Sequence, residues 1–259
     1  MNVNHGVLAS QFDYDALVFL NTTGITTSSI RLAINYLVFS LKVNGIWSKL
    51  NAIYPFVGGT AATHKFNLKD PRDLDVAFRL FFSGGWTHSS TGALPNGTNA
   101  YANTFLTPST QLSLNGHSFG IYSRTNNITG NRIYGSFSSA TQTLQQNIVL
   151  PPGFVSAFQS GNSLFTYAIN TTSLHVATRT SSTVFKGFRA GVLVGSSATP
   201  MTTLPTFSFY FGARNQTTVF GYSPHQLAFG FLGAGLTDAE ATILYTIVQN
   251  FQTILARQV

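Results

Sequence analysis

The sequence predicts a mainly β protein, built as a two-sheet antiparallel sandwich with one helix near each end of the chain. Short runs of alternating apolar and polar or small residues fill the middle of the chain, and Gly, Asn, Pro and Ser separate many of them at spacings of about ten residues. Helical periodicity appears in two stretches, about 27–44 and about 237–256. We therefore expect a β-sandwich to which two helices are added.

The last stretch of the chain, 226–259, carries the clearest change from strand to helix. Large apolar residues alternate with Ala or Gly over 227–231, which is typical of a strand with one large apolar face. Thr237 and Glu240 then match a capping box, in which each side chain accepts the other residue's free backbone N–H. Six apolar residues follow at helical spacing: Ala241, Leu244, Tyr245, Val248, Phe251 and Leu255. We expect a closing strand with a helix packed on it.

The N-terminal part divides into an arm and the start of the domain. Residues 1–13 are polar and patternless, so we interpret them as an N-terminal arm that precedes a single sandwich domain over 14–259. The run Asp15–Leu20 (DALVFL) is predicted as a first strand. Apolar residues at helical spacing then predict a helix that is capped near 26–28 and ends at Gly45, since glycine is favoured just beyond a helix.

The middle of the chain is predicted to be strands and one long loop. The alternating residues that mark the strands are Phe78, Leu80 and Phe82; Leu112 and Leu114; Phe119 and Ile121; Ile133 and Phe137; Leu164 and Thr166; Leu174, Val176 and Thr178; Phe188, Ala190, Val192 and Val194; and Phe207, Phe209 and Phe211. The longest irregular stretch is 84–103, and loops of that length in compact domains often bind partners.

Composition excludes several classes of protein. The net charge is +7, but the 14 basic residues are scattered and form no run that would follow phosphates, so we expect no nucleic-acid binding. The absence of cysteine excludes disulfides and thiolate metal sites. Neither a signal peptide nor an apolar run of about 18 residues is present, so we expect no membrane partner and synthesis in a cytoplasm.

Several segments carry a resemblance to a known family. They are Ala33–Asn35 (AIN), Ala52–Thr60 (AIYPFVGGT), His64–Asp73 (HKFNLKDPRD), Gly85–Gly92 (GWTHSSTG), Phe209–Asn215 (FYFGARN) and Leu236–Glu240 (LTDAE). Over roughly 15–259 the chain resembles the concanavalin A-like jelly rolls of the laminin-G type. It is more closely similar to a sub-group of these domains found in structural proteins of tailed bacteriophages.

This resemblance implies a virion component that acts through protein–protein contacts: a capsid decoration protein, a head fibre, or a tail fibre part. The implied location is the virion, after synthesis in the host cytoplasm, and the implied partners are capsid or fibre subunits, with a homo-oligomer expected. The family gives no catalytic residue to carry over. The alternative function is a carbohydrate-binding adhesion module that recognises host or mucus glycans.

Hydrolase chemistry is not expected, although many jelly rolls of this kind are glycoside hydrolases. Those enzymes need two carboxylates at a fixed separation, and the chain has a single glutamate, Glu240, which the capping box already explains. A pair of aspartates is the alternative that stays open. The run Gly116–Gly120 (GHSFG) matches the G-x-S-x-G pattern of a nucleophile elbow, but it lies between two strand-like segments, so we interpret it as a hairpin turn.

No cofactor is expected, and the alternative is one Ca²⁺ ion at the main acidic cluster. Asp70, Asp73 and Asp75 offer the oxygen ligands that Ca²⁺ prefers. Lys69 and Arg72 are interleaved with them and can neutralise the carboxylates directly, so we favour a salt-bridged turn. The six histidines are dispersed and none matches a metal motif.

The 84–103 stretch is the candidate binding loop for a glycan or a protein partner. Trp86, His88 and Tyr101 offer rings for stacking, and Asn96 and Asn99 offer planar amides for hydrogen bonds to hydroxyls. Two interpretations stay open: the loop grips a sugar, or Trp86 plugs the edge of the sandwich while the loop contacts a neighbouring subunit.

Three predicted strands end in an arginine followed by a small polar residue. These arginines are Arg124, Arg179 and Arg214. Either they cap sheet edges and donate to turn carbonyls, or they form a shared functional rim at one end of the sandwich.

Overall fold

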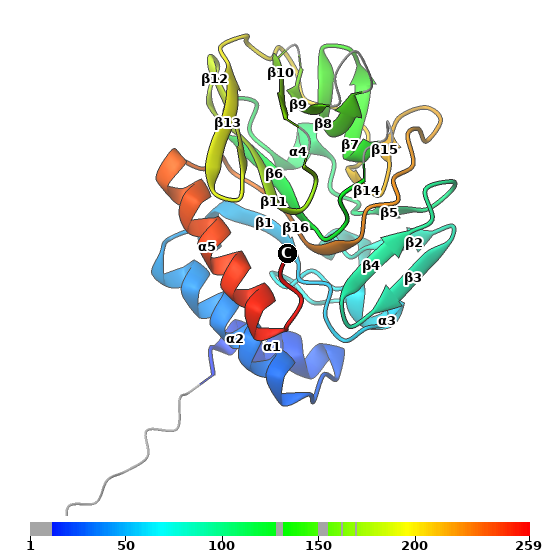
Figure 1. The fold of residues 1–259 in the computed structure, drawn as a ribbon, viewed down its shortest axis with the longest axis vertical. Coiled ribbons are helices and arrows are strands. Elements are labelled where there is room, and N and C mark those ends of the chain that lie inside the picture. Colours follow the sequence, from blue (N-terminus) through cyan, green and yellow to red (C-terminus); the bar gives the residue numbers. More distant parts are fainter. Residues whose placement is uncertain (1–11, 128–131, 150–154, 162, 169) are drawn as a thin grey trace, which may run out of the picture.

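The computed structural model describes residues 12–127, 132–149, 155–161, 163–168 and 170–259, so the expected arm lies almost entirely outside the described residues. Two eight-stranded sheets pack face to face, and helices cover the outer side of one of them (Figure 1). This architecture confirms the predicted mainly β sandwich with helices near both ends of the chain. No helix among the described residues is long and apolar enough to cross a membrane.

The first sheet is antiparallel throughout and has the order β13-β12-β11-β6-β16-β4-β3, with β1 also paired to β16. Its strands are β1 (Leu50–Tyr54), β3 (Trp86–Ser89), β4 (Gly92–Pro95), β6 (His117–Ser123), β11 (Ser173–Ser181), β12 (Val184–Arg189), β13 (Val192–Ser197) and β16 (Leu227–Gly233).

The second sheet has the order β10-β9-β8-β7-β14-β5-β2, and β15 pairs with β7 as its one parallel strand among the described residues. Its strands are β2 (Phe81–Ser83), β5 (Tyr101–Asn103), β7 (Arg132–Ser139), β8 (Gln142–Val149), β9 (Val155–Ser160), β10 (Ser163–Ala168), β14 (Tyr210–Phe211) and β15 (Arg214–Asn215).

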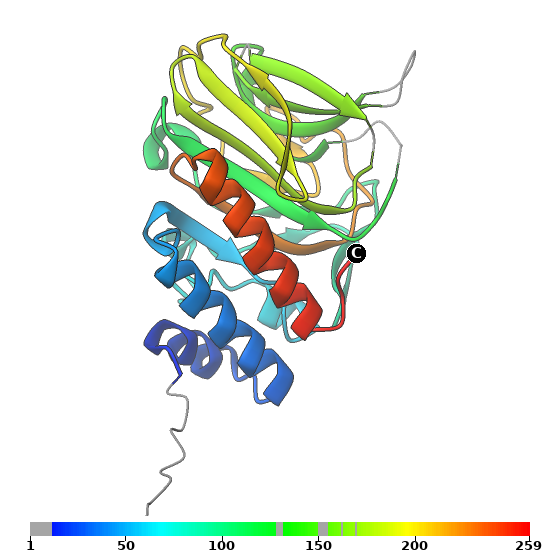
Figure 2. The ribbon, with the colours of Figure 1, turned by 60° about the vertical axis from the view of Figure 1, so that its left-hand side comes forward.

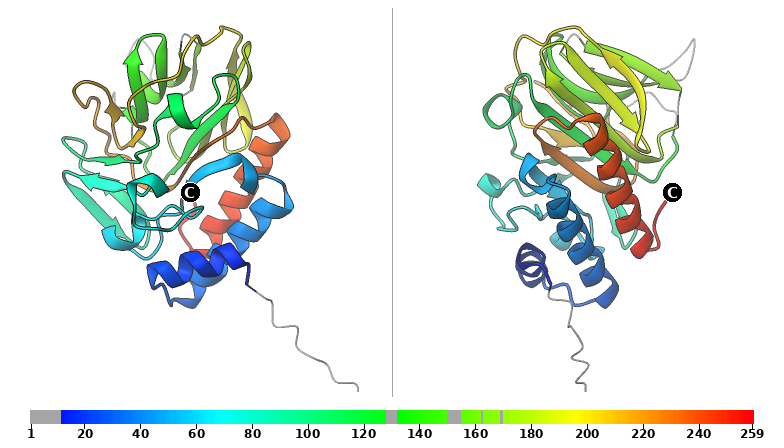
Figure 3. Two further views of the ribbon diagram at one scale, coloured as in Figure 1. Left: turned by 180° about the vertical axis from the view of Figure 1, so that it is seen from behind. Right: turned by 90° about the vertical axis from the view of Figure 1, so that its left-hand side faces the viewer.

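Three helices form a layer on the outside of the first sheet: α1 (Tyr14–Thr23), α2 (Ser28–Val43) and α5 (Asp238–Ile254). Figure 2 shows α5 next to the sheet, α2 beside α5, and α1 on the far side of α2. The same layer is seen from two further directions in Figure 3. The shorter helices are α3 (Ala61–His64) and α4 (Pro108–Gln111), and single 3-10 turns span Trp47–Lys49 and Asp75–Ala77.

Strand β16 connects the two hydrophobic layers of the molecule. Phe229 and Phe231 pack into the core between the first sheet and the helices, whereas Leu232 packs into the core between the two sheets. Gly230 lies where a Cβ atom would come within 2.9 Å of the Phe211 ring, so glycine is needed for the two sheets to approach each other there. The small residues in this strand therefore set the spacing of the sandwich.

The C-terminal helix is fixed at both ends. The predicted capping box is present: Glu240 N–H donates to Thr237 Oγ1 at 3.3 Å, and Thr237 N–H donates to Glu240 Oε2 at 2.8 Å. Beyond the helix, the fully buried Arg257 donates to the carbonyls of Pro55 and Phe56 at 2.7 Å each and to that of Ala228 at 2.8 Å. One guanidinium thereby joins the chain terminus to β16 and to the segment after β1.

The predicted first strand at Asp15–Leu20 is wrong, because these residues form helix α1. Asp13 caps the helix by accepting the Asp15 N–H at 2.9 Å, and Gly24 ends it in the left-handed conformation. Ala16, Phe19 and Leu20 are its buried residues, and they are spaced three and four apart. A short apolar run fits either a strand or a helix, and here the caps decide.

Several boundaries in the middle of the chain also differ from the prediction. The 84–103 stretch is not an irregular loop, since it contains the β3–β4 hairpin and β5. The GHSFG run forms the start of β6 and not a turn. The run 188–194 is two strands joined at Ala190–Gly191, while Leu112 and Leu114 lie outside any strand. Strands β8 and β9 were not predicted, because their apolar alternation is interrupted by glutamine and serine.

Candidate functional site

Trp86, the central residue of the predicted binding loop, is held by the sandwich edge. Its indole N–H donates to the carbonyls of Ser83 at 3.0 Å and Tyr101 at 3.3 Å. The half-buried ring packs on the core between the sheets and meets the Phe82 ring edge-to-face at 5.1 Å between centroids. This geometry favours the interpretation in which Trp86 plugs the sandwich edge.

The amides of Asn96 and Asn99 are engaged within their own loop. Asn99 Oδ1 accepts the Gly85 N–H at 3.0 Å and the Asn96 side-chain amide at 2.8 Å. Asn96 Oδ1 accepts the backbone N–H groups of Thr98 at 3.0 Å and of Asn99 at 3.1 Å. Both side chains therefore shape the loop after β4.

His88 contacts a second histidine that is distant in sequence. Its Nδ1 lies 2.9 Å from Nδ1 of His64, whose Nε2 accepts the Gly59 N–H at 3.2 Å. Burial is the main reason that the pKa of His64 is lowered to about 3. The described residues contain no group of three or more His, Cys, Asp or Glu side chains that could hold a metal ion.

Tyr101, by contrast, belongs to a surface that the sequence analysis did not identify. Its ring stacks on Tyr210 of β14, with 4.7 Å between centroids and 5° between planes. Both rings are half-buried and lie on the face of the second sheet that is turned away from the first sheet. The next residue in each strand, Ala102 or Phe211, belongs to the core between the sheets, and side chains alternate between the two faces of a strand, so the tyrosines point outward.

One row of directly paired residues crosses this outer face. Each residue of the row is paired with the next one on the neighbouring strand, from β2 through β5, β14, β7 and β8 to β9. Residues directly opposite each other in an antiparallel ladder project from the same face. Together with the Tyr101 ring, we call this row the outer strip, and its members are Phe81, Asn103, Tyr210, Gly135, Gln145 and Gln159.

The outer strip combines aromatic rings with amides. Phe81 is 52% exposed. Asn103 accepts the Phe105 N–H at 2.8 Å through Oδ1, which leaves its amide N–H₂ for another acceptor. At the other end, Gln145 donates to Gln159 at 2.6 Å. This end of the row is covered, since Gly135 is buried and Gln145 is only 3% exposed, so the open part of the strip is its Phe81, Asn103 and Tyr210 end.

Arg214, predicted as part of a strand-end rim, stands beside the strip instead. It lies on β15, pairs with Gly135 and donates to Gln145 Oε1 at 3.0 Å. Arg124 and Arg179 lie elsewhere, at opposite ends of the paired strands β6 and β11. Arg179 is fully buried and donates to Ser163 Oγ at 2.6 Å. The three arginines therefore form no shared rim, because antiparallel strands end at opposite edges of a sheet.

The predicted acidic cluster is occupied by ion pairs within the chain. Arg72 pairs with Asp70 at 2.5 Å, and Lys65 with Asp73 at 2.5 Å. Arg79 pairs with Asp73 at 2.9 Å and with Asp75 at 2.8 Å. Hydrogen bonds from these cations lower the pKa of Asp70 and Asp73. Arg72 thus acts as the favoured salt-bridged turn expects, whereas Lys69 donates instead to the Trp47 carbonyl at 2.8 Å.

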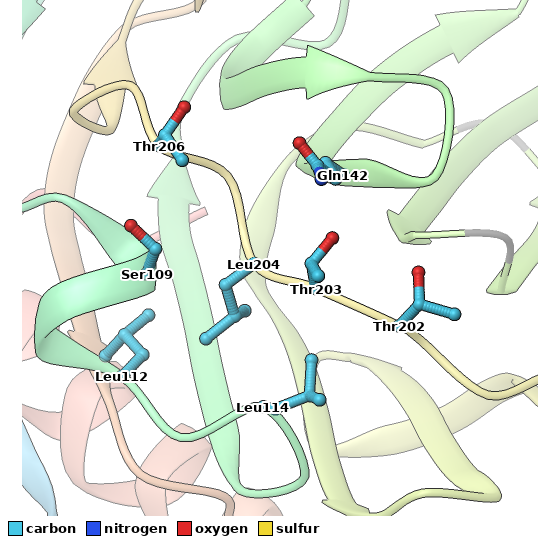
Figure 4. A pocket seen from close by; sticks show the side chains of 8 residues that line it. All are labelled: Ser109, Leu112, Leu114, Gln142, Thr202, Thr203, Leu204 and Thr206. Carbon is cyan, nitrogen blue, oxygen red and sulfur yellow. The ribbon is translucent and has the colours of Figure 1, made fainter.

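A separate hollow of about 390 Å³ lies at the end of the sandwich, beside α4. Figure 4 shows its three leucine side chains near one another and Thr203 between them and Gln142. Its lining residues are Ser109, Leu112, Leu114, Gln142, Thr202, Thr203, Leu204 and Thr206. The lining contains neither an aromatic ring nor a charged group, so it lacks the stacking surface and the charges that the outer strip and its neighbours provide.

Comparison with known proteins identifies the fold. No family model matches the sequence, and no curated protein matches it. Solved structures do match: the Trypanosoma rangeli sialidase in complex with 2,3-difluoro-KDN has a TM-score of 0.55 at 10% identity, covering 78% of this chain and 33% of that chain. A structure of botulinum neurotoxin type C, whose cell entry depends on two ganglioside molecules, has a TM-score of 0.54 at 9% identity, covering 80% and 53%.

The binding domain of botulinum neurotoxin DC, in complex with rat synaptotagmin II, has a TM-score of 0.53 at 9% identity, covering 79% of this chain and 52% of that domain. The chain thus spans about half the length of the toxin structures and a third of the sialidase. At these identities the likeness shows a shared sandwich fold. It supports the fold that the resemblance to concanavalin A-like jelly rolls implied.

Proposed function

We propose that this chain is a non-catalytic carbohydrate-binding module and that the outer strip is its binding surface. The observation that carries the proposal is the exposed part of the strip, where the rings of Phe81, Tyr101 and Tyr210 surround the Asn103 amide on the outer face of the second sheet. Flat rings bind the apolar faces of sugars, and amides bind hydroxyls in the plane of the ring, so a few such groups give both affinity and orientation.

The distribution of carboxylates supports a binding role over hydrolysis. All seven acidic residues lie between 13 and 75 or at 238 and 240, and the segment 76–237 contains none. Every residue of the outer strip comes from that segment. A glycosidase needs an acid and a base or nucleophile beside the sugar, and the strip itself offers neither carboxylate.

The structural neighbours are consistent with this proposal. The toxin structure is described by its dependence on gangliosides, and the sialidase structure holds a sugar acid analogue. Likeness at 9–10% identity does not transfer these ligands, so the proposal depends on the strip.

The test is glycan-array binding followed by calorimetry with the best ligand. We expect Tyr210→Ala to weaken binding about tenfold, since loss of one aromatic contact costs on the order of 1 kcal/mol. Tyr14→Ala is the matched control, because Tyr14 is 76% exposed on α1, in the helical layer. The proposal fails if a broad array gives no binding, or if both variants bind like the parent.

A second candidate function is a structural role in a phage particle, which the sequence resemblance suggests. One observation favours protein contacts on the helical layer: Leu32, Phe39 and Val43 of α2 are 55%, 58% and 67% exposed. Their spacing places them on one face of the helix. Solution mass by light scattering tests this role, since a monomer that remains monomeric at high concentration speaks against a subunit interface here.

A further inference from the structure

Two arginines and two phenylalanines stack beside the outer strip. The Arg214 guanidinium carbon lies 4.2 Å from the Phe137 ring centroid and 5.2 Å from that of Phe220. The Arg132 guanidinium carbon lies 5.2 Å from the same Phe220 ring. We call this set the guanidinium–phenyl stack; cation–π contacts of this kind hold the charged groups in fixed planes.

The hydrogen-bonding capacity of the stack is largely unused. Arg132 donates through its backbone N–H to Gly221, and its guanidinium has no hydrogen-bond partner among the described residues. Its Nε and that of Arg214 are both buried without a partner in the described part of the chain. Arg214 itself is only 9% exposed and donates to Gln145 and Gln216. A surface ligand cannot reach those two buried atoms, but the terminal nitrogens of Arg132 are not buried and make no hydrogen bond among the described residues, so they can donate to one.

No acidic side chain compensates these two cations. The segment 76–237 has seven basic residues and no acidic one, whereas the rest of the chain has seven of each. Arg79 and Lys186 reach acids of the flanking segments, but Arg132 and Arg214 make no ion pair among the described residues. Burial, together with the charge of Arg132, lowers the pKa of Arg214 to about 10. The molecule thus keeps two neighbouring positive charges without a counter-charge.

We propose that the glycan bound on the outer strip is acidic, and that its carboxylate or sulfate group lies against Arg132 and Arg214. This inference rests on the proposed function and adds the class of sugar. The planar guanidinium pairs with such anions through two parallel N–H donors, and Gln145, held by Arg214, joins the anion site to the strip. Neutral parts of the same glycan then lie along the Tyr210 ring and the Asn103 amide.

A nucleic-acid ligand fits the same surface less well. A phosphate chain requires a track of cations, whereas the stack supplies two charges at one end of a row of neutral amides. The outer strip contains no lysine and no arginine of its own. A single anionic group on an otherwise neutral ligand matches this distribution better.

The experiment compares matched ligands by calorimetry at low and high salt. Trigalacturonate carries a carboxylate on each sugar where the neutral α-1,4-galactotriose carries a hydroxymethyl group. A sulfated galactose oligomer tests whether a sulfate is bound instead. We expect at least one acidic ligand to bind about tenfold more tightly than the neutral one at low salt, with the difference shrinking in 0.5 M NaCl. Equal affinities for the neutral and the acidic ligands would overturn the inference.

Variants separate this inference from the function on which it rests. We expect Arg132→Gln to remove the preference for the acidic ligand while the neutral ligand binds unchanged. Arg132 is less buried than Arg214, so this variant should fold more readily than Arg214→Gln. Arg189→Gln, on β12 of the other sheet, is the charge-matched control and should keep the preference. If Tyr210→Ala weakens neutral binding but Arg132→Gln changes nothing, the function stands and the acidic class is wrong. Tighter binding of a single-stranded oligonucleotide than of any glycan overturns the inference.

Discussion

Four buried histidines are expected to make this protein unfold on mild acidification. Burial lowers the pKa of His64 and His175 to about 3 and that of His117 and His225 to about 4. Histidine in an unfolded chain titrates near 6.5. Between these values the unfolded chain binds protons that the folded chain does not, so the free energy of unfolding is largest above pH 6.5 and falls as the pH drops toward 4.

Hydrogen-bond geometry at two of the rings adds to the effect of burial. His64 Nε2 accepts the Gly59 N–H at 3.2 Å, and His175 Nδ1 lies 2.9 Å from the Gln146 amide nitrogen. The other nitrogen of His175 lies 3.2 Å from the Thr172 carbonyl, to which it donates. A second proton on either ring would therefore set one N–H against another and leave a charge in the core.

The magnitude follows from the size of these shifts. Each ring contributes about 1.4 kcal/mol per pH unit once the unfolded chain is protonated. Between pH 7 and pH 5 each ring therefore costs about 2 kcal/mol, and the four together about 8 kcal/mol. That loss is comparable to the whole stability of an ordinary domain, which is about 5–15 kcal/mol.

Urea unfolding followed by tryptophan fluorescence at pH 7, 6 and 5 measures this loss. The variant His175→Gln should retain about three quarters of the pH dependence, because one of the four titrating rings is gone. His117→Gln provides an independent repeat at a second buried ring. A parent protein whose free energy of unfolding changes by less than about 1 kcal/mol from pH 6 to pH 5 would refute the reasoning.

Three further predictions concern single side chains. Arg257→Met removes a fully buried guanidinium and leaves its carbonyl acceptors unpaired, so we expect the free energy of unfolding to fall by about 3–5 kcal/mol and the melting temperature, measured by calorimetry, to fall by about 10 °C. Arg189→Met is the control: Arg189 makes one side-chain hydrogen bond, of 3.3 Å, so its loss should cost under about 1 kcal/mol. Trp86→Ala should destabilise by about 3 kcal/mol in urea yet leave glycan affinity within about twofold, and a large affinity loss would restore Trp86 as a binding residue. Asp73→Asn should change stability by less than about 1 kcal/mol, and added CaCl₂ should not raise the melting temperature of the parent; a rise that Asp73→Asn abolishes would establish a calcium site.

Local signals in the sequence were sufficient where one segment decides its own structure. Thr237 and Glu240 specify the start of α5 because both partners of the capping box lie three residues apart. Asp15–Leu20 was predicted as a strand but forms a helix, because a run of six residues fits both the strand period and the helix period. The caps that decide between them, Asp13 and Gly24, lie outside the run. In the acidic cluster, Arg72 pairs with Asp70 as the sequence suggested, but Lys69 does not pair there, and Lys65 and Arg79 are partners that the sequence analysis did not name.

The outer strip was hidden from the sequence for a physical reason. A bulge between Arg132 and Tyr134 shifts the pairing register, so Ile133 and Tyr134 are both buried and simple alternation fails in β7. The faces of β14 and β5 are likewise defined by pairing partners about a hundred residues apart. The exposed side of these short strands therefore has no periodic signature of its own.

Sequence alone is enough to derive the fold class, the two amphipathic helices, the absence of a glutamate pair, and a basic middle segment without acids, since each depends on composition or on neighbours within a few residues. The three-dimensional fold was needed to show that Trp86 packs at an edge, that the three strand-end arginines lie apart, and that Tyr101, Tyr210 and Arg214 share one surface. The reason is that antiparallel pairing and β-bulges, acting between distant segments, choose which side chains meet on a face.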